Sequence, residues 1–268
     1  MNDSRKKVAD GIYDAAATQV MENVADQDGS GKSGQTDRNI FAWYAQVLPK
    51  QLVGVHIIDW GAGVGRFVSF FEARGIQKIT LVEPSDNSFA ALNAHFRSRA
   101  HLELIQGGIG GQVLRPSTPQ NTIHVCTFVV NCITSLPTAF DALAVSTLPG
   151  ERLFLVTNVF APKAIVDSIK DSRNESAVPI NIAEAPTPSL RLPTTPTFNN
   201  EIIGSGEVLK DSVHTLAEYA ELWRSEGTRW DTLNAKLMLP DGFRHKVLNG
   251  ESFGDYCFAV LVMELVRR

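Results

Sequence analysis

The residues with the clearest potential for chemistry lie where an apolar segment gives way to glycines. Residues 57–67 read Ile-Ile-Asp-Trp-Gly-Ala-Gly-Val-Gly-Arg-Phe, so Asp59 is followed by Gly61, Gly63 and Gly65 at alternate positions. An apolar strand that ends in a carboxylate and turns through glycines into a helix is typical of a binding turn, because glycines let the backbone approach a ligand closely. The segment therefore predicts a ligand site at the carboxyl end of a strand.

A second acidic residue closes the next apolar segment, which reads Leu-Val-Glu-Pro-Ser over residues 81–85. A carboxylate at the position of Glu83 can accept hydrogen bonds from both hydroxyls of a ribose, as the comparable acid does in nucleotide-binding folds. The two acids together predict a ligand that contains adenosine.

The glycine spacing does not fit the dinucleotide-binding fingerprint. That fingerprint, G-x-G-x-x-G, would need a glycine at position 66, where the chain has Arg66. A nicotinamide-dependent oxidoreductase, NAD(P)-linked, with Glu83 on the ribose is therefore the alternative and not the first interpretation.

With these two strand ends the chain resembles the class I S-adenosylmethionine-dependent methyltransferases of the small-molecule type. Their first motif is an apolar strand, an acid and Gly-x-Gly-x-Gly, and their next strand ends in an acid that holds ribose. The resemblance implies S-adenosyl-L-methionine as the cofactor and S-adenosyl-L-homocysteine as its product. It also implies the cofactor-binding residues, which are Asp59, Gly61, Ala62, Gly63, Gly65, Glu83, Pro84, Gly108, Ile109 and Asn131.

The same resemblance divides the ligand among these residues. Asp59 and the glycine backbone would face the methionine part, and Glu83 would hold the ribose. The segment Gln-Gly-Gly-Ile at 106–109 matches the loop beside the adenine. Many members have an Asp where this chain has Gly108, so we expect the adenine to rest on Ile109 and on backbone groups.

Three residues are candidates for the acceptor side of the reaction. Asn131 would lie at the end of the fourth strand, beside the transferable methyl group in this family, and its amide can orient a nucleophile. His214 lies where a Pro-rich stretch meets a helix and is a candidate general base, although residues 212–215 also read as a helix start. Tyr13 resembles the aromatic cap that small-molecule methyltransferases fold over the cofactor, and Asp14 beside it is a further proton acceptor. Tyr13, Trp43 and Tyr44 also read as core residues of helices.

The elements that must position these residues alternate between strands and helices. The fold class is therefore α/β: a Rossmann-like, seven-stranded, mostly parallel sheet with helices on both faces, plus N-terminal helices and a Pro-rich insertion forming a lid. Strands are expected at 53–59, 78–83, 102–106, 122–131, 152–157, 232–239 and 256–266. Helices are expected at 8–24, 38–48, 66–74, 88–98, 137–148 and 215–226.

This reading divides the chain into four parts. Residues 1–50 form an N-terminal helical cap, and residues 51–160 form the core that binds S-adenosylmethionine. Residues 161–212 form the Pro-rich lid. Residues 213–268 supply a helix and the last two strands of the sheet.

Composition narrows the function further. The 268 residues carry a formal charge of −4 without any long basic tract, so we expect a small-molecule acceptor and not nucleic acid. No stretch reaches the roughly 18 uninterrupted apolar residues of a membrane span, and three cysteines without CxxC spacing favour the cytoplasm. The histidine spacing predicts no metal site.

These observations predict a methyltransferase that acts by in-line displacement on an O or N atom of a small molecule. The alternatives that stay open are a protein or tRNA acceptor, the oxidoreductase, and a non-catalytic methyltransferase-like protein that binds a partner.

Overall fold

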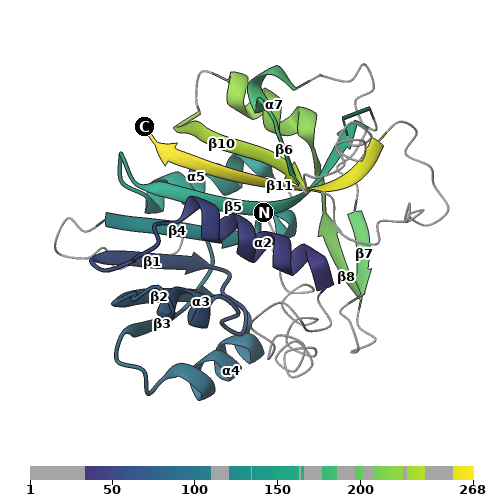
Figure 1. Cartoon of the computed structure of the whole chain (residues 1–268). Coiled ribbons are helices and arrows are strands. Elements are labelled where there is room, and N and C mark those ends of the chain that lie inside the picture. Colours follow the sequence, from purple (N-terminus) through teal and green to yellow (C-terminus); the bar gives the residue numbers. More distant parts are fainter. Residues whose placement is uncertain are drawn as a thin grey trace.

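The centre of the molecule is one mixed sheet whose parallel half holds the predicted glycine-rich turn (Figure 1). The structure, a computed structural model, describes residues 34–109, 121–133, 135–162, 164–165, 177–185, 197–201, 208–225, 228–238 and 256–268. The parallel strands lie in the order β3-β2-β1-β4-β5. Their bounds are β1 (Val55–Trp60), β2 (Lys78–Glu83), β3 (Leu102–Gln106), β4 (Asn121–Thr127) and β5 (Arg152–Pro162).

The other half of the sheet is antiparallel. β11 (Tyr256–Arg267) runs antiparallel to β5 along most of its length, and β10 (Trp230–Met238) and β6 (Ala177–Pro179) follow it to the edge. The short β9 (His214–Thr215) pairs with the end of β5. β7 (Thr197–Glu201) and β8 (Val208–Ser212) form a separate hairpin. All seven expected strands join one sheet, which confirms the predicted fold class.

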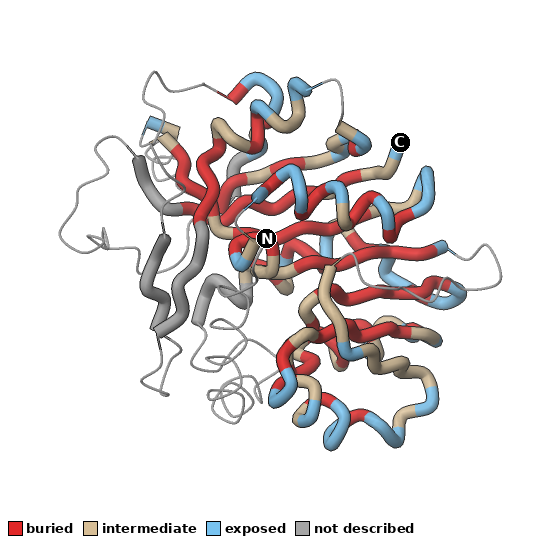
Figure 2. The backbone as a smooth tube through the Cα atoms, turned by 180° about the vertical axis from the view of Figure 1, so that it is seen from behind, coloured by how far each residue is buried: buried red, intermediate tan, exposed pale blue. Residues whose placement is uncertain are grey.

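Helices cover both faces of the sheet because alternate side chains of each strand point to opposite faces. On β1, Ile57 packs in the core cluster beneath α2 (Gly34–Val47), α3 (Val68–Glu72) and α4 (Asp86–Phe96). Ile58 and Trp60 pack in the cluster beneath α5 (Leu136–Ser146) and α7 (Leu216–Arg224). Figure 2 shows buried backbone running through the strands, with exposed residues mainly on helices and connections.

Side-chain caps set where three of these helices begin, because the first backbone N–H groups of a helix lack partners within it. Ser85 accepts from Ser88 N at 3.2 Å at the start of α4, and Ser135 caps α5. Thr215 and Glu218 form a capping box at the start of α7. None of the helices in the described part of the chain has the length and apolar character that crossing a membrane requires.

Most element boundaries differ from the prediction by one or more residues, and the structure gives a reason for three of these differences. β4 ends at Thr127 and not at residue 131, because Phe128 takes a left-handed φ of 58° that breaks the extended chain. β5 continues to Pro162 because β11 pairs with it along that whole length. The helix expected at 66–74 is limited to α3, because the glycine bend continues through Gly65.

Candidate functional site

The carboxyl ends of β1, β2 and β4 lie next to one another along one end of the sheet, because these parallel strands run in the same direction. The bend after β1 turns back against β2: Gly61 N and Ala62 N donate to Val82 O at 2.8 Å and 3.0 Å. Gly65 N then donates to Ala62 O at 2.9 Å. Gly61, Gly63 and Gly65 have φ of 68°, 56° and 84°, a region that only glycine adopts without strain.

The three glycines serve different purposes. A Cβ atom on Gly61 would collide with the side chain of Val129, which follows β4, and one on Gly65 would collide with Phe96 of α4. A Cβ atom on Gly63 would meet no atom of the described residues within 4 Å. Gly61 and Gly65 therefore allow close packing, whereas Gly63 leaves bare backbone beside open space, where a ligand can approach.

Glu83 at the end of β2 is fixed against this bend. Its side chain is buried, its Oε2 accepts from Gly63 N at 2.7 Å, and its Oε1 accepts from Ser85 N at 2.9 Å. Pro84 lies between Glu83 and Ser85 in the chain. Each carboxylate oxygen has two lone pairs and can accept two hydrogen bonds.

Asp59 lies beside Glu83, at the end of β1, and its side chain is only 2% exposed. Its Oδ2 atom has no hydrogen-bond partner in the described structure. Burial, and then the neighbouring charge of Glu83, raise the pKa of Asp59 from an ordinary 3.8 to about 8. Such a carboxylate is costly to ionise without a positively charged or hydrogen-donating partner.

The segment after β3 is open in the same way as Gly63. Gly107 N donates to Glu83 O at 3.1 Å, which places this segment next to the acid. Cβ atoms on Gly107 and Gly108 would meet nothing within 4 Å, and the half-buried Ile109 packs against the core cluster under α5 and α7. The structure thus combines bare backbone with an apolar side chain where the adenine is expected; binding there stays a prediction.

Asn131 lies in the short 3-10 helix η1 (Val130–Cys132) and not in a strand as expected. It is 2% exposed, and its Oδ1 atom has no hydrogen-bond partner in the described structure. An amide oxygen that is buried without a partner is a binding group that a ligand can satisfy.

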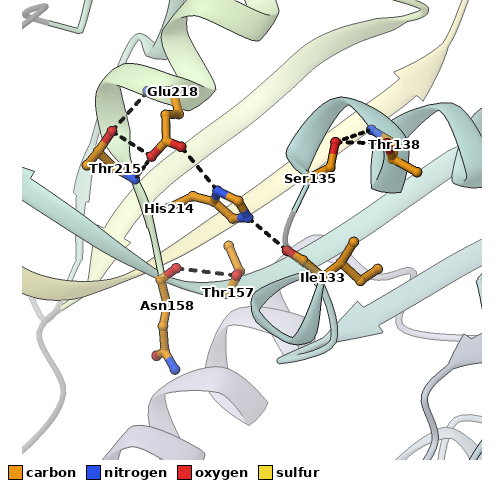
Figure 3. A network of polar contacts seen from close by, with 8 residues as sticks. All are labelled: Ile133, Ser135, Thr138, Thr157, Asn158, His214, Thr215 and Glu218. Atoms are coloured by element: carbon orange, nitrogen blue, oxygen red, sulfur yellow. Dashed lines mark hydrogen bonds and ion pairs between the residues drawn. The ribbon is translucent and has the colours of Figure 1, made fainter. Parts of the chain in front are cut away.

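His214 is buried in β9, and Figure 3 shows its ring between Glu218 and Ile133. Its Nε2 donates to Ile133 O at 3.0 Å, since a carbonyl oxygen only accepts, and its Nδ1 lies 3.4 Å from Glu218 Oε1. Both ring nitrogens therefore contact acceptors within the protein. A general-base role stays a prediction. Tyr13 and Asp14 lie outside the described residues.

Tyr44 of α2 contacts the end of β4, a position that the sequence did not indicate. Its hydroxyl group hydrogen-bonds Thr127 Oγ1 at the end of β4, at 2.7 Å. Burial raises the pKa of Tyr44 well above its ordinary value, the hydrogen bond to Thr127 opposes this, and the nearby Asp59 raises it further. Helical periodicity predicted only that Trp43 and Tyr44 are core residues, and both are buried.

No protein-family model and no curated protein matches the sequence. Solved structures match over most of the chain. A protein from Listeria monocytogenes classed as an S-adenosylmethionine dependent methyltransferase superposes with a TM-score of 0.52 and 12% identity, over 86% of this chain and 99% of that one. Geranyl diphosphate C-methyltransferase from Streptomyces coelicolor gives 0.54 and 12%, over 87% and 78%. The cyclase SpnF gives 0.54 and 12%, over 96% and 94%.

At identities this low the superpositions bear on the fold alone. The chain has the Rossmann-like fold seen in class I S-adenosylmethionine-dependent methyltransferases, as the resemblance in its sequence predicted.

Proposed function

We propose that this protein is an S-adenosylmethionine-dependent methyltransferase that transfers a methyl group to an O or N atom of a small-molecule acceptor. The observation that carries the proposal is the pair of buried acids, Asp59 and Glu83, at neighbouring strand ends, with Asp59 Oδ2 lacking a partner. Two neighbouring buried carboxylates favour a cationic ligand, because its positive charge offsets both the repulsion between them and the free-energy cost of burying them.

S-adenosylmethionine fits these residues better than a dinucleotide does. Its ammonium group would pair with Asp59, its ribose hydroxyls would donate to Glu83, and the open backbone at Gly63 would pass close to it. A dinucleotide needs free backbone N–H groups for its pyrophosphate. Here the N–H groups of Gly61, Ala62 and Gly63 already donate to Val82 O and Glu83 Oε2.

The residues of the chain would contribute mainly by alignment. When bound, S-adenosylmethionine supplies an electrophilic methyl group on a positively charged sulfur. The Oδ1 atom of Asn131, which has no hydrogen-bond partner in the described structure, would accept a hydrogen bond from the molecule that receives the methyl group. This bond would orient the lone pair of that molecule toward the methyl group. Holding two reactants in line can contribute about 7–11 kcal/mol without a metal or a covalent intermediate.

A second candidate comes from the comparisons. One similar structure is named a C-methyltransferase, and another is named a cyclase. A carbon acceptor, or a protein with this fold that does not transfer methyl groups, is therefore the alternative against which transfer to O or N is tested.

The first experiment is calorimetric titration of the protein with S-adenosylmethionine, S-adenosylhomocysteine, NADH and NADPH. We expect binding of the first two only, and Glu83→Ala should weaken it at least tenfold while the protein stays folded. Binding of a nicotinamide coenzyme alone would refute the proposal. Incubating cell extract with methyl-labelled donor, with and without the protein, then identifies the labelled acceptor and the atom.

A further inference from the structure

The turn of residues 128–133, which carries Asn131, has a conformation that its own sequence does not favour. Phe128 is not a glycine, yet its φ is 58°. A left-handed residue with a side chain costs of order 1–3 kcal/mol and persists only where surrounding structure holds it. Within the turn, Cys132 N donates to Val129 O at 2.9 Å and Ile133 N donates to Val130 O at 3.0 Å, and neither bond involves Phe128 itself. Contacts from other elements therefore have to hold Phe128.

Two elements hold the first part of the turn. Phe128 N donates to Val156 O of β5 at 2.7 Å, which ties the residue after β4 to the neighbouring strand. The side chain of Val129 lies so close to Gly61 that a Cβ atom there would collide with it. This end of the turn is thus fixed against the sheet and the glycine bend.

His214 holds the other end of the turn through a single hydrogen bond, from Nε2 to Ile133 O at 3.0 Å (Figure 3). The imidazole is 2% exposed, so water does not compete freely for that bond. β8, which precedes β9 in the chain, also lies against η1.

The orientation of the ring is set by α7. Glu218 Oε1 faces His214 Nδ1 at 3.4 Å, while Glu218 Oε2 accepts from Thr215 N at 2.6 Å and from Thr215 Oγ1 at 2.9 Å. Burial raises the pKa of Glu218, but the hydrogen bonds from His214 and Thr215 lower it more, so its pKa lies below the ordinary value. The carboxylate of Glu218, which is anchored in the capping box, lies beside Nδ1, and the opposite nitrogen, Nε2, points toward the turn.

We propose that His214 is a positioning residue: it holds the turn of residues 128–133 through Ile133 O and so keeps the side chain of Asn131 in place. This role is the alternative to the general-base role that the sequence suggested, because both ring nitrogens face oxygen atoms of the protein. The inference rests on the proposed function only in giving Asn131 a substrate to orient.

The test compares two variants of similar size at one position. His214→Leu removes the donor, whereas the side-chain amide of His214→Gln can still donate to Ile133 O. Hydrogen exchange of the Ile133 amide, followed by NMR, should become at least tenfold faster in the Leu variant and stay within about threefold of wild type in the Gln variant. His101→Leu is the matched control, because His101 also contacts a glutamate, Glu72, at 2.8 Å but precedes β3, the edge strand of the parallel half of the sheet.

A measurement on the wild-type protein decides the question even if the Leu variant does not fold. Side-chain 15N spectra should show a slowly exchanging Nε2–H signal that disappears in His214→Gln. Absence of that signal, or equal exchange at Ile133 in the Leu and Gln variants, would overturn the assignment. These readouts need no S-adenosylmethionine, so failure of the wild-type protein to bind that compound would refute the proposed function and leave this result standing.

Discussion

Asn in place of Asp59 should make the ligand-free protein more stable, although it removes a residue that we place in the site. In the folded protein the pKa of Asp59 is about 8, against an ordinary 3.8. At pH 7 the unfolded chain has released this proton and the folded chain keeps it. Folding therefore has to take up a proton, and at about 1.36 kcal/mol per pH unit that costs up to about 4 kcal/mol.

The sign of the pH dependence follows from the raised pKa. The folded state binds the proton more tightly, so wild-type stability should fall as the pH rises from about 4 to about 8. Asp59→Asn cannot ionise and escapes this loss. The NH2 group that this substitution buries has no assigned hydrogen-bond partner and costs about 1–3 kcal/mol. The net gain in stability at pH 7 is therefore roughly 1–3 kcal/mol, and little or no gain is expected near pH 4.5.

The assay is urea unfolding of wild type and Asp59→Asn at pH 4.5, 6, 7 and 8, with free energies taken from linear extrapolation. Asp141→Asn is the matched control, because Asp141 is exposed on α5 and should change stability by no more than about 0.5 kcal/mol at any pH. A difference between wild type and Asp59→Asn that stays constant across this range would show that Asp59 does not hold a proton in the folded state.

Three further predictions address the ligand and a second buried group. S-adenosylmethionine affinity, measured by calorimetry, should rise by up to tenfold per unit between pH 5.5 and 7 because Asp59 must lose its proton to pair with a cation; an unchanged affinity would exclude that pairing. Gly63→Val should abolish binding, and Gly63→Ala should weaken it far more than Gly150→Ala, which introduces the same left-handed strain beside open space at the start of β5; equal affinities of the two alanine variants would remove Gly63 from the site. Burial, with a smaller effect of Lys78, lowers the pKa of His56 from 6.5 to about 4, so the unfolded chain binds the proton more tightly than the folded protein does. Up to about 3 kcal/mol of stability is therefore lost as the pH falls from 6.5 to 4. Urea unfolding of His56→Gln should show a shallower loss, and a slope identical to that of wild type would contradict this prediction.

Periodicity and turn residues were sufficient to predict the sheet because both are local signals. Alternation of strands and helices between residues 53 and 157 predicted the parallel half. The position of Asp59 and Glu83 after apolar segments predicted that both lie at one edge, and both are buried there. Parallel strands bring their carboxyl ends together whatever the loops between them do, so this part of the site needs no long-range information.

The part of the candidate site that the turn of residues 128–133 forms could not be predicted in the same way. The apolar run after residue 122 continues past Thr127, so its pattern gives no sign that Phe128 turns the chain. The contacts that define this part join residues far apart in the chain: His214 reaches Ile133 across 81 positions, and Tyr44 reaches Thr127 across 83. Such pairs depend on how loops and helices close over the sheet, and no local pattern encodes that.

The pH dependence of stability and that of binding are two views of one proton on Asp59. If a cation pairs with its carboxylate, the complex keeps Asp59 ionised, and the uptake of a proton that opposes folding of the free protein no longer occurs. The free energy lost by the free protein as the pH rises must then equal the free energy gained in affinity over the same range. A dinucleotide would not give this rise, because the free protein already holds Asp59 protonated below about pH 8, and ionisation above that pH would repel an anion and weaken its binding. The direction of this one dependence therefore distinguishes the two classes of ligand that the fold accommodates.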